Sequence, residues 1–230
     1  MIPTVLIPGL VCTAELFALQ VGALWTRGPV TLASTLNGET MGDLAAAILA
    51  DAPPRFALAG LSMGGYVALE IMRRAPDRVL RLALLDTSAR PDTPEQTEGR
   101  RAAIARTKAG EFEAVLGETA PRLLHPDHQT DATLIGAQVR MGLAVGAKAY
   151  VRQQTAIIGR IDSRPHLAGV TVPTWVLVGD KDAVTPPDRA KEMASAIPGA
   201  RLEIVEGAGH LTPMEQPDAV ERLLTEWLAD

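Results

Sequence analysis

Residues 56–74, FALAGLSMGGYVALEIMRR, decide the fold of this chain. The first four are apolar and predict a buried strand, whereas residues 66–74 place apolar side chains at helical spacing. Ser62 lies between the two in the pattern G-x-S-x-G, flanked by Gly60 and Gly64. A tight strand-to-helix turn crowds the residues two before and two after the serine, so these must be nearly free of side chain. The pattern therefore predicts a Ser62 hydroxyl lifted clear of a sheet, where a base and a substrate can reach it.

A glycine-rich turn whose serine merely caps a helix would give the same pattern. The two interpretations differ in what they require of the rest of the chain. A nucleophilic serine needs a histidine and an acid further along, in the order serine, acid, histidine. The downstream sequence therefore decides between them.

Composition limits the classes of protein to consider. With 230 residues, 47% of them hydrophobic, the chain can bury one full core and a modest insertion. The net charge is −5 and no basic run appears, which disfavours nucleic-acid binding. The single cysteine, Cys12, excludes an internal disulfide and is best read as a small buried residue. No apolar run reaches the ~18 residues of a membrane span, and no charged segment precedes the first apolar stretch as in a signal peptide. We expect a soluble cytoplasmic protein.

Strands and helices alternate over the first 90 residues. The strands are apolar without alternation, which predicts a parallel sheet covered on both faces. The expected strands are 4–7, 30–33, 56–59 and 78–86, and the expected helices are 14–24, 40–50 and 66–74.

The pattern changes after Asp86, because residues 91–165 contain no convincing strand. We interpret them as a helical insertion lying over the edge of the sheet. Strand and helix then alternate again to the end of the chain. The expected helices of the insertion are 94–108, 111–116, 131–143 and 147–160; strands 174–178 and 202–205 and helices 187–197 and 217–228 follow.

An acid and a histidine follow the last two predicted strands. Asp182 comes after the strand at 174–178, and His210 comes after the strand at 202–205. Carboxyl ends of parallel strands lie at one edge of a sheet, so both side chains are expected to approach Ser62. Imidazole can take the serine proton and return it to a leaving group, and a carboxylate on the other ring nitrogen orients the imidazole. These residues predict a nucleophile, base and acid.

Three motifs in this order resemble the α/β-hydrolase fold superfamily: G-x-S-x-G at residues 60–64, G-x-x-D at residues 179–182, and Gly209-His210. The resemblance covers essentially the whole chain. It implies a three-layer α/β fold with a mostly parallel sheet of about six strands. It also implies a core formed by residues 1–90 and 166–230, with residues 91–165 as a helical cap.

The resemblance further implies an oxyanion hole. Pro8-Gly9-Leu10 would be the oxyanion loop, and the backbone N–H groups of Leu10 and Met63 would bind the oxyanion. Many relatives have His-Gly where this chain has Pro8-Gly9. The chain also begins at what would be the third strand of the family.

Other residues compete for two of the predicted roles. Asp86 also ends a strand, where some hydrolases place their acid, and Asp180 is better interpreted as a turn residue. His125 and His128 have H-x-x-H spacing, which is a weak indication of a metal site, and His166 is expected at the surface. Only His210 follows a strand after the acid.

The sequence predicts a serine hydrolase, carboxylesterase-like, that cleaves a small, partly apolar carboxylic ester through an acyl-enzyme on Ser62. No metal or cofactor is needed, and the oligomeric state stays open. A lactonase, thioesterase, C–C hydrolase or perhydrolase could use the same residues, as could a ligand receptor that retains them. Epoxide and haloalkane hydrolysis is disfavoured, because relatives with that chemistry have aspartate in place of the serine. The insertion supplies apolar candidates for the lining of the site, without showing which of them point into it: Leu116, Leu123, Leu124, Leu134, Ile135, Met141, Leu143 and Ile157.

Overall fold

A six-stranded sheet forms the centre of the molecule, which the computed structural model describes over all residues 1–230. The strand order is β2-β1-β3-β4-β5-β6, and every neighbouring pair is parallel. This confirms the predicted fold class and the number of strands. The order reverses between β1 and β3, so the chain leaves β1 toward one side of the sheet and returns on the other. The strands are β1 (Thr4–Ile7), β2 (Val30–Leu32), β3 (Phe56–Leu61), β4 (Val79–Leu85), β5 (Thr174–Gly179) and β6 (Arg201–Val205).

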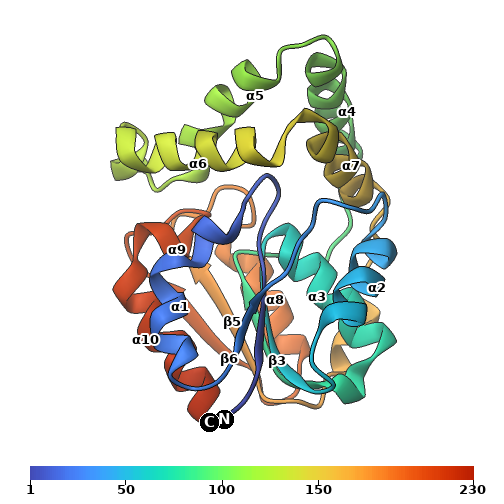
Figure 1. The fold of residues 1–230 in the computed structure, drawn as a ribbon, viewed down its shortest axis with the longest axis vertical. Coiled ribbons are helices and arrows are strands. Elements are labelled where there is room, and N and C mark those ends of the chain that lie inside the picture. Colours follow the sequence, from blue (N-terminus) through green and yellow to red (C-terminus); the bar gives the residue numbers. More distant parts are fainter.

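Helices cover both faces of the sheet (Figure 1). One face packs against α1 (Ala18–Trp25) and α10 (Pro217–Ala229), and Leu6 of β1 points into that layer. The other face packs against α2, α3 and α8, and Val5 and Ile7 point into that layer. This alternation explains why strands β1, β3 and β5 are buried along their whole length, as a doubly covered parallel sheet requires. The bounds on the second face are α2 (Met41–Asp51), α3 (Met63–Arg74) and α8 (Pro187–Ala196).

Side-chain bonds fix two of these helices. A capping box begins α2, in which Thr40 accepts from the Asp43 backbone and Asp43 accepts from the Thr40 backbone. Trp227 of α10 is fully buried, and its indole N–H donates to the Leu82 carbonyl at 3.1 Å, which joins this helix to the centre of the sheet.

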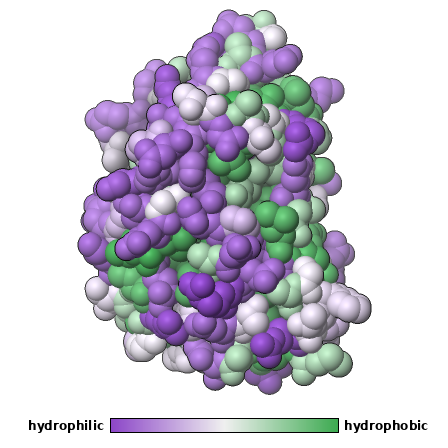
Figure 2. Space-filling view, turned by 90° about the vertical axis from the view of Figure 1, so that its left-hand side faces the viewer, coloured by the Kyte–Doolittle hydropathy of each residue, from purple (hydrophilic) through white to green (hydrophobic).

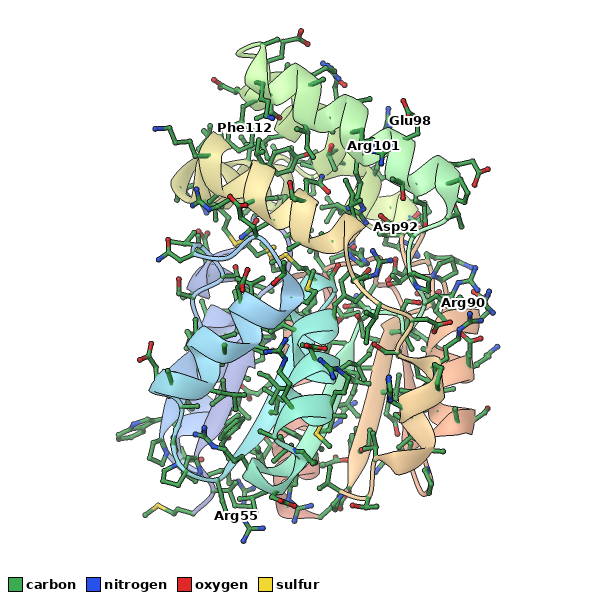
Figure 3. The ribbon with its side chains drawn as sticks, turned by 90° about the vertical axis from the view of Figure 1, so that its right-hand side faces the viewer. Arg55, Arg90, Asp92, Glu98, Arg101 and Phe112 are labelled. Carbon is green, nitrogen blue, oxygen red and sulfur yellow. The ribbon has the colours of Figure 1, made fainter.

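Four helices occupy residues 94–158 and lie beyond the carboxyl ends of the strands (Figure 1). Figure 3 shows Asp92 at the junction between this helical segment and the sheet. The expected helices are present, with ends that differ by a few residues. The assignment of residues 91–165 as a separate cap stays a prediction. The bounds are α4 (Pro94–Lys108), α5 (Phe112–Thr119), α6 (Ala132–Val145) and α7 (Ala147–Ile158).

The structure differs from the sequence prediction in several places. Helix α3 begins at Met63 rather than at residue 66, and 3₁₀ helices that were not expected occur at Pro76–Arg78, Ala120–Leu123, Pro126–His128 and Arg164–Gly169. The helix expected over 14–24 begins as a 3₁₀ turn, Ala14–Phe17, whose first turn is capped by the Thr13 side chain. A short helix α9 (Thr212–Glu215) follows His210 and was not expected, because four residues carry no periodic pattern.

Hydrophilic residues cover most of the face seen in Figure 2, with apolar patches between them. None of the helices has the length and hydropathy needed to cross a membrane.

The turn between β3 and α3 brings two stretches of backbone very close together. A Cβ atom at Gly60 would overlap the Gly64 carbonyl, and one at Gly64 would overlap the Ile7 carbonyl. Ser62 has φ 53° and ψ −114°, a left-handed conformation that is rare for a residue with a side chain. Close packing at both glycines therefore holds Ser62 in a strained conformation at the end of β3.

We expect Gly60→Ala to destabilise the protein by about 1–3 kcal/mol, because the added methyl group must displace backbone. Gly136→Ala is the matched control, since Gly136 lies inside α6 with nothing within 4 Å of the new methyl group. That change should stabilise the protein by about 0.5–1 kcal/mol through helix propensity. Urea unfolding of both variants measures the difference, and equal stabilities would contradict this description of the turn.

Candidate active site

Ser62, His210 and Asp182 form one hydrogen-bonded chain at the carboxyl edge of the sheet. The Ser62 Oγ atom lies 2.8 Å from His210 Nε2, and His210 Nδ1 lies 2.8 Å from Asp182 Oδ2. An ionised carboxylate can only accept, so Nδ1 carries the proton that it donates to Asp182. Nε2 is then the acceptor for the Ser62 hydroxyl. The three residues come from loops after β3, β5 and β6, as the parallel sheet predicts.

Neighbouring donors fix the Asp182 carboxylate. Its Oδ1 atom accepts from the backbone N–H groups of Val184 at 2.8 Å and Thr185 at 2.9 Å. Its Oδ2 atom accepts from the Thr185 hydroxyl at 2.8 Å as well as from His210. The sequence analysis did not identify Thr185, although a threonine three residues after an aspartate at the end of a strand is a recognisable turn pattern.

Opposite charges perturb both members of the buried acid–base pair. Burial alone would raise the pKa of Asp182, but the charge of His210 and the bonds from His210 and Thr185 hold that pKa below its ordinary value. Burial alone would lower the pKa of His210, but the Asp182 carboxylate raises it above its ordinary value of 6.5. The pair is therefore arranged to favour an imidazolium beside a carboxylate.

The two alternative acids lie close by but make no hydrogen bond to His210. Asp86 is fully buried and accepts from the Gly179 N–H at 3.0 Å and the Thr212 hydroxyl at 2.6 Å. Burial raises the pKa of Asp86 well above its ordinary value, and the charge of Asp182 adds to the effect. Asp180 accepts from the Ala208 N–H at 3.2 Å and acts as a turn residue. Of these three acids, only Asp182 bonds the imidazole.

The other histidines do not join this chain. His125 accepts from the Asp127 N–H at 3.1 Å, His128 contacts Glu215 at 3.0 Å, and His166 is exposed. No three side chains among His, Cys, Asp and Glu gather in an arrangement that would bind a metal ion. The H-x-x-H spacing therefore reflects a turn at the base of the helical segment.

Glu215 is a buried carboxylate that the sequence analysis did not identify. Its Oε1 atom accepts from the backbone N–H groups on either side of His210, those of Gly209 at 2.8 Å and Leu211 at 3.3 Å. Its Oε2 atom accepts from the His125 N–H at 2.7 Å. The same carboxylate thus supports the histidine loop and joins that loop to the helical segment.

The predicted oxyanion loop follows β1, next to Ser62. Met63 begins α3, so its N–H has no partner within the helix, and the Leu10 N–H donates to no protein acceptor. Val11 has φ 51°, which is strained for a β-branched residue, and its N–H donates to Gln153 Oε1 at 3.1 Å. Gln153 of α7 in turn bonds Thr35, so the helical segment supports this loop. The roles of Leu10 and Met63 stay predictions.

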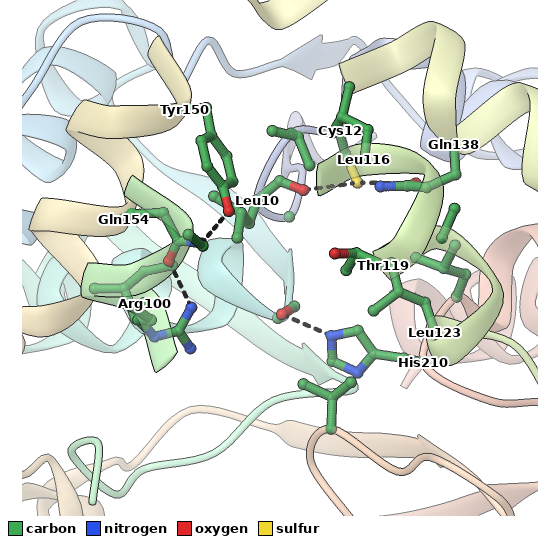
Figure 4. Close-up of a pocket in the computed structure, with 18 of the residues that line it drawn as sticks. Leu10, Cys12, Arg100, Leu116, Thr119, Leu123, Gln138, Tyr150, Gln154 and His210 are labelled. Atoms are coloured by element: carbon green, nitrogen blue, oxygen red, sulfur yellow. Dashed lines mark hydrogen bonds between the residues drawn. The ribbon is translucent and has the colours of Figure 1, made fainter. Parts of the chain in front are cut away.

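A cavity of about 410 Å³ opens over Ser62 and His210. Figure 4 shows Leu116, Leu123 and Leu10 on its wall. Of the eight apolar candidates, only Leu116, Leu123 and Ile157 line it. The other five candidates do not line it. Leu124, Leu134, Ile135 and Met141 pack in the core, and Leu143 is exposed, because the sequence does not reveal the direction in which a side chain of the insertion points.

Cys12 also lines this cavity. Its Sγ atom lies 3.4 Å from the Leu10 carbonyl and 3.8 Å from Gln138 Oε1. Burial raises the pKa of the thiol to about 12, so it stays protonated and is not a nucleophile at neutral pH. Ser62 is the nucleophile candidate in the cavity.

Comparisons with known proteins identify relatives of this chain. A model of the alpha/beta hydrolase family matches residues 5–223. A pimeloyl-[acyl-carrier protein] methyl ester esterase of Neisseria meningitidis is 28% identical over 206 residues, which are 88% of this chain and 79% of that protein.

Two solved structures share the fold over nearly the full chain. A thermophilic esterase from Thermogutta terrifontis, solved with malate bound, has a TM-score of 0.91 and 30% identity, with 100% of this chain and 90% of that one covered. The enol-lactonase from Burkholderia xenovorans has a TM-score of 0.89 and 25% identity, with 99% and 91% covered. These relatives support an enzyme that hydrolyses its substrate.

The geometry predicts how His210 titrates. We expect an NMR titration to place the pKa of His210 above 6.5, and the Asp182→Asn variant to lower it, because the carboxylate that opposes burial most strongly is then lost while Asp86 and Glu215 stay. Asp180→Asn is the matched control and should leave the His210 titration unchanged. The same midpoint in the wild type and Asp182→Asn would show that Asp182 does not face this imidazole.

Proposed function

This chain belongs to the alpha/beta hydrolase family, and we propose that it is a serine hydrolase that cleaves a small, partly apolar carboxylic ester. The observation that carries the proposal is the chain of two 2.8 Å contacts from Ser62 through His210 to Asp182. A serine hydroxyl is a weak nucleophile at neutral pH and needs an adjacent base. His210 is that base, and Asp182 holds the tautomer that leaves Nε2 free to accept the proton.

The reaction then follows two similar steps. The Ser62 oxygen attacks the ester carbonyl carbon while His210 takes the hydroxyl proton. His210 returns this proton to the departing alcohol, which leaves an acyl group on Ser62. A water molecule gives its proton to His210 and attacks the acyl carbonyl, and the carboxylic acid departs as Ser62 regains its proton.

Two backbone donors would stabilise the negative oxygen that forms in each step. The N–H of Met63 stands at the start of α3, where the helix dipole favours negative charge, and the N–H of Leu10 has no competing protein acceptor. Loss of one donor of this kind typically costs about 10²–10³ in rate. Neither Pro8 nor Gly9 has a side-chain donor, so in this loop only backbone N–H groups would bind the oxyanion.

Residues 91–165 act as a cap over this site, on a core formed by residues 1–90 and 166–230. Fifteen of the 24 residues around the cavity are hydrophobic, which favours a substrate with an apolar part. A lactone is a cyclic ester and needs the same groups. The likeness to an enol-lactonase over 99% of this chain therefore supports lactone hydrolysis as the second candidate.

A panel of p-nitrophenyl esters of increasing acyl length, with lactones and thioesters beside it, tests this proposal. Ser62→Ala should lower kcat/KM by at least about 10³-fold on every substrate that is turned over, because the nucleophile is lost. Ser195→Ala, an exposed position on α8, is the matched control and should keep wild-type rates. Wild-type rates in Ser62→Ala would rule out the acyl-enzyme.

A further inference from the structure

Arg100 of α4 is the only permanently charged side chain that lines the cavity, and no carboxylate lines it. Figure 4 shows its guanidinium across the cavity from His210, with the terminal nitrogens toward the cavity. The Arg100 side chain is 19% exposed, so much of the solvent that would screen its charge is excluded. A guanidinium charge that is partly buried in a mostly apolar cavity is costly unless it is paired and hydrogen-bonded.

The charge of Arg100 is only partly balanced by the protein. Asp92, whose side chain is 2% exposed, accepts from Arg100 Nε at 2.7 Å through Oδ2. Its other oxygen accepts from Arg160 Nη1 at 2.7 Å. One carboxylate thus serves two guanidinium groups, and one positive charge is left over in this cluster.

The same contacts leave donors free on the cavity side. Arg100 uses Nε for Asp92 and Nη1 for Gln154 Oε1 at 2.8 Å, whereas its Nη2 group has no acceptor within the protein. The Gln154 amide donates to the Tyr150 hydroxyl at 2.8 Å, so this hydroxyl keeps its own proton to donate. Both Arg100 and Tyr150 line the cavity. The Tyr150–Gln154–Arg100 chain therefore orients a cation and a neutral donor together.

We propose that Arg100 and Tyr150 form a subsite for a carboxylate of the substrate, so that the enzyme acts on esters that carry a free acid group remote from the scissile bond. This inference rests on the proposed function and names its substrate class. A planar guanidinium with one free terminal group matches a singly charged carboxylate.

Calorimetry on the Ser62→Ala protein tests the subsite without turnover. The ligands are monomethyl and dimethyl esters of straight-chain dicarboxylic acids from succinate to suberate, in which each pair differs only in the free acid group. We expect at least one monomethyl ester to bind tenfold or more tighter than its dimethyl partner, and this ratio to fall toward one when Arg100→Gln is added. Arg101→Gln, an exposed neighbour on α4 (Figure 3), should keep the ratio.

The outcomes separate this inference from the proposed function. Three results with the Ser62→Ala protein alone would overturn the subsite: equal binding within every pair, stronger binding of the diesters, or no binding by any ester. A preference that survives Arg100→Gln also overturns it. In the Arg100→Gln variant, Asp92 still forms its ion pair with Arg160, so the substitution does not leave a buried carboxylate unpaired. Failure of Ser62-dependent turnover with p-nitrophenyl esters would instead overturn the hydrolase proposal, whatever the calorimetry shows.

Discussion

The close approach of backbone around Ser62 is the constraint on which the rest of the structure depends. Because Gly60 and Gly64 have no side chain, β3 can turn directly into α3 against the end of β1. The strand order reverses between these same two strands, and in open parallel sheets ligands bind in the crevice at such a point. The loop after β1 and the serine after β3 are therefore brought together by topology, before any side-chain contact forms.

The helical segment over the sheet does more than cover this crevice. The Leu123 carbonyl accepts from the His210 backbone N–H at 2.7 Å, and Glu215 bonds both this loop and the His125 N–H. On the other side of the cavity, Gln153 of α7 holds Val11 in its strained conformation. The position of the candidate base and the shape of the candidate oxyanion loop thus both depend on contacts with residues 91–165. Substitutions in this segment should therefore change the rate of the reaction as well as the choice of substrate.

Sequence reasoning succeeded where the signal is local. A few consecutive residues suffice to predict the turn at Ser62 and the strand ends before Asp182 and His210. The parallel sheet then brings these three residues to one edge. Glu215, Gln153 and Arg100 could not be found in this way. Each of them has at least one partner more than 50 residues away in the chain, so their roles depend on packing rather than on spacing. The same reason explains why most of the apolar candidates for the cavity wall point elsewhere, although the helices of the insertion were predicted with ends that differ by a few residues.

The central claim is that Ser62 is a nucleophile activated by His210. Labelling with a fluorophosphonate, followed by intact mass measurement and peptide mapping, tests it most directly, because this reagent reacts with activated serines irrespective of the natural substrate. We expect one adduct per chain, located on Ser62, and labelling that slows by at least about 10²-fold in His210→Ala, as loss of a general base implies. An adduct on another residue, or equally rapid labelling of Ser62 without His210, would contradict it.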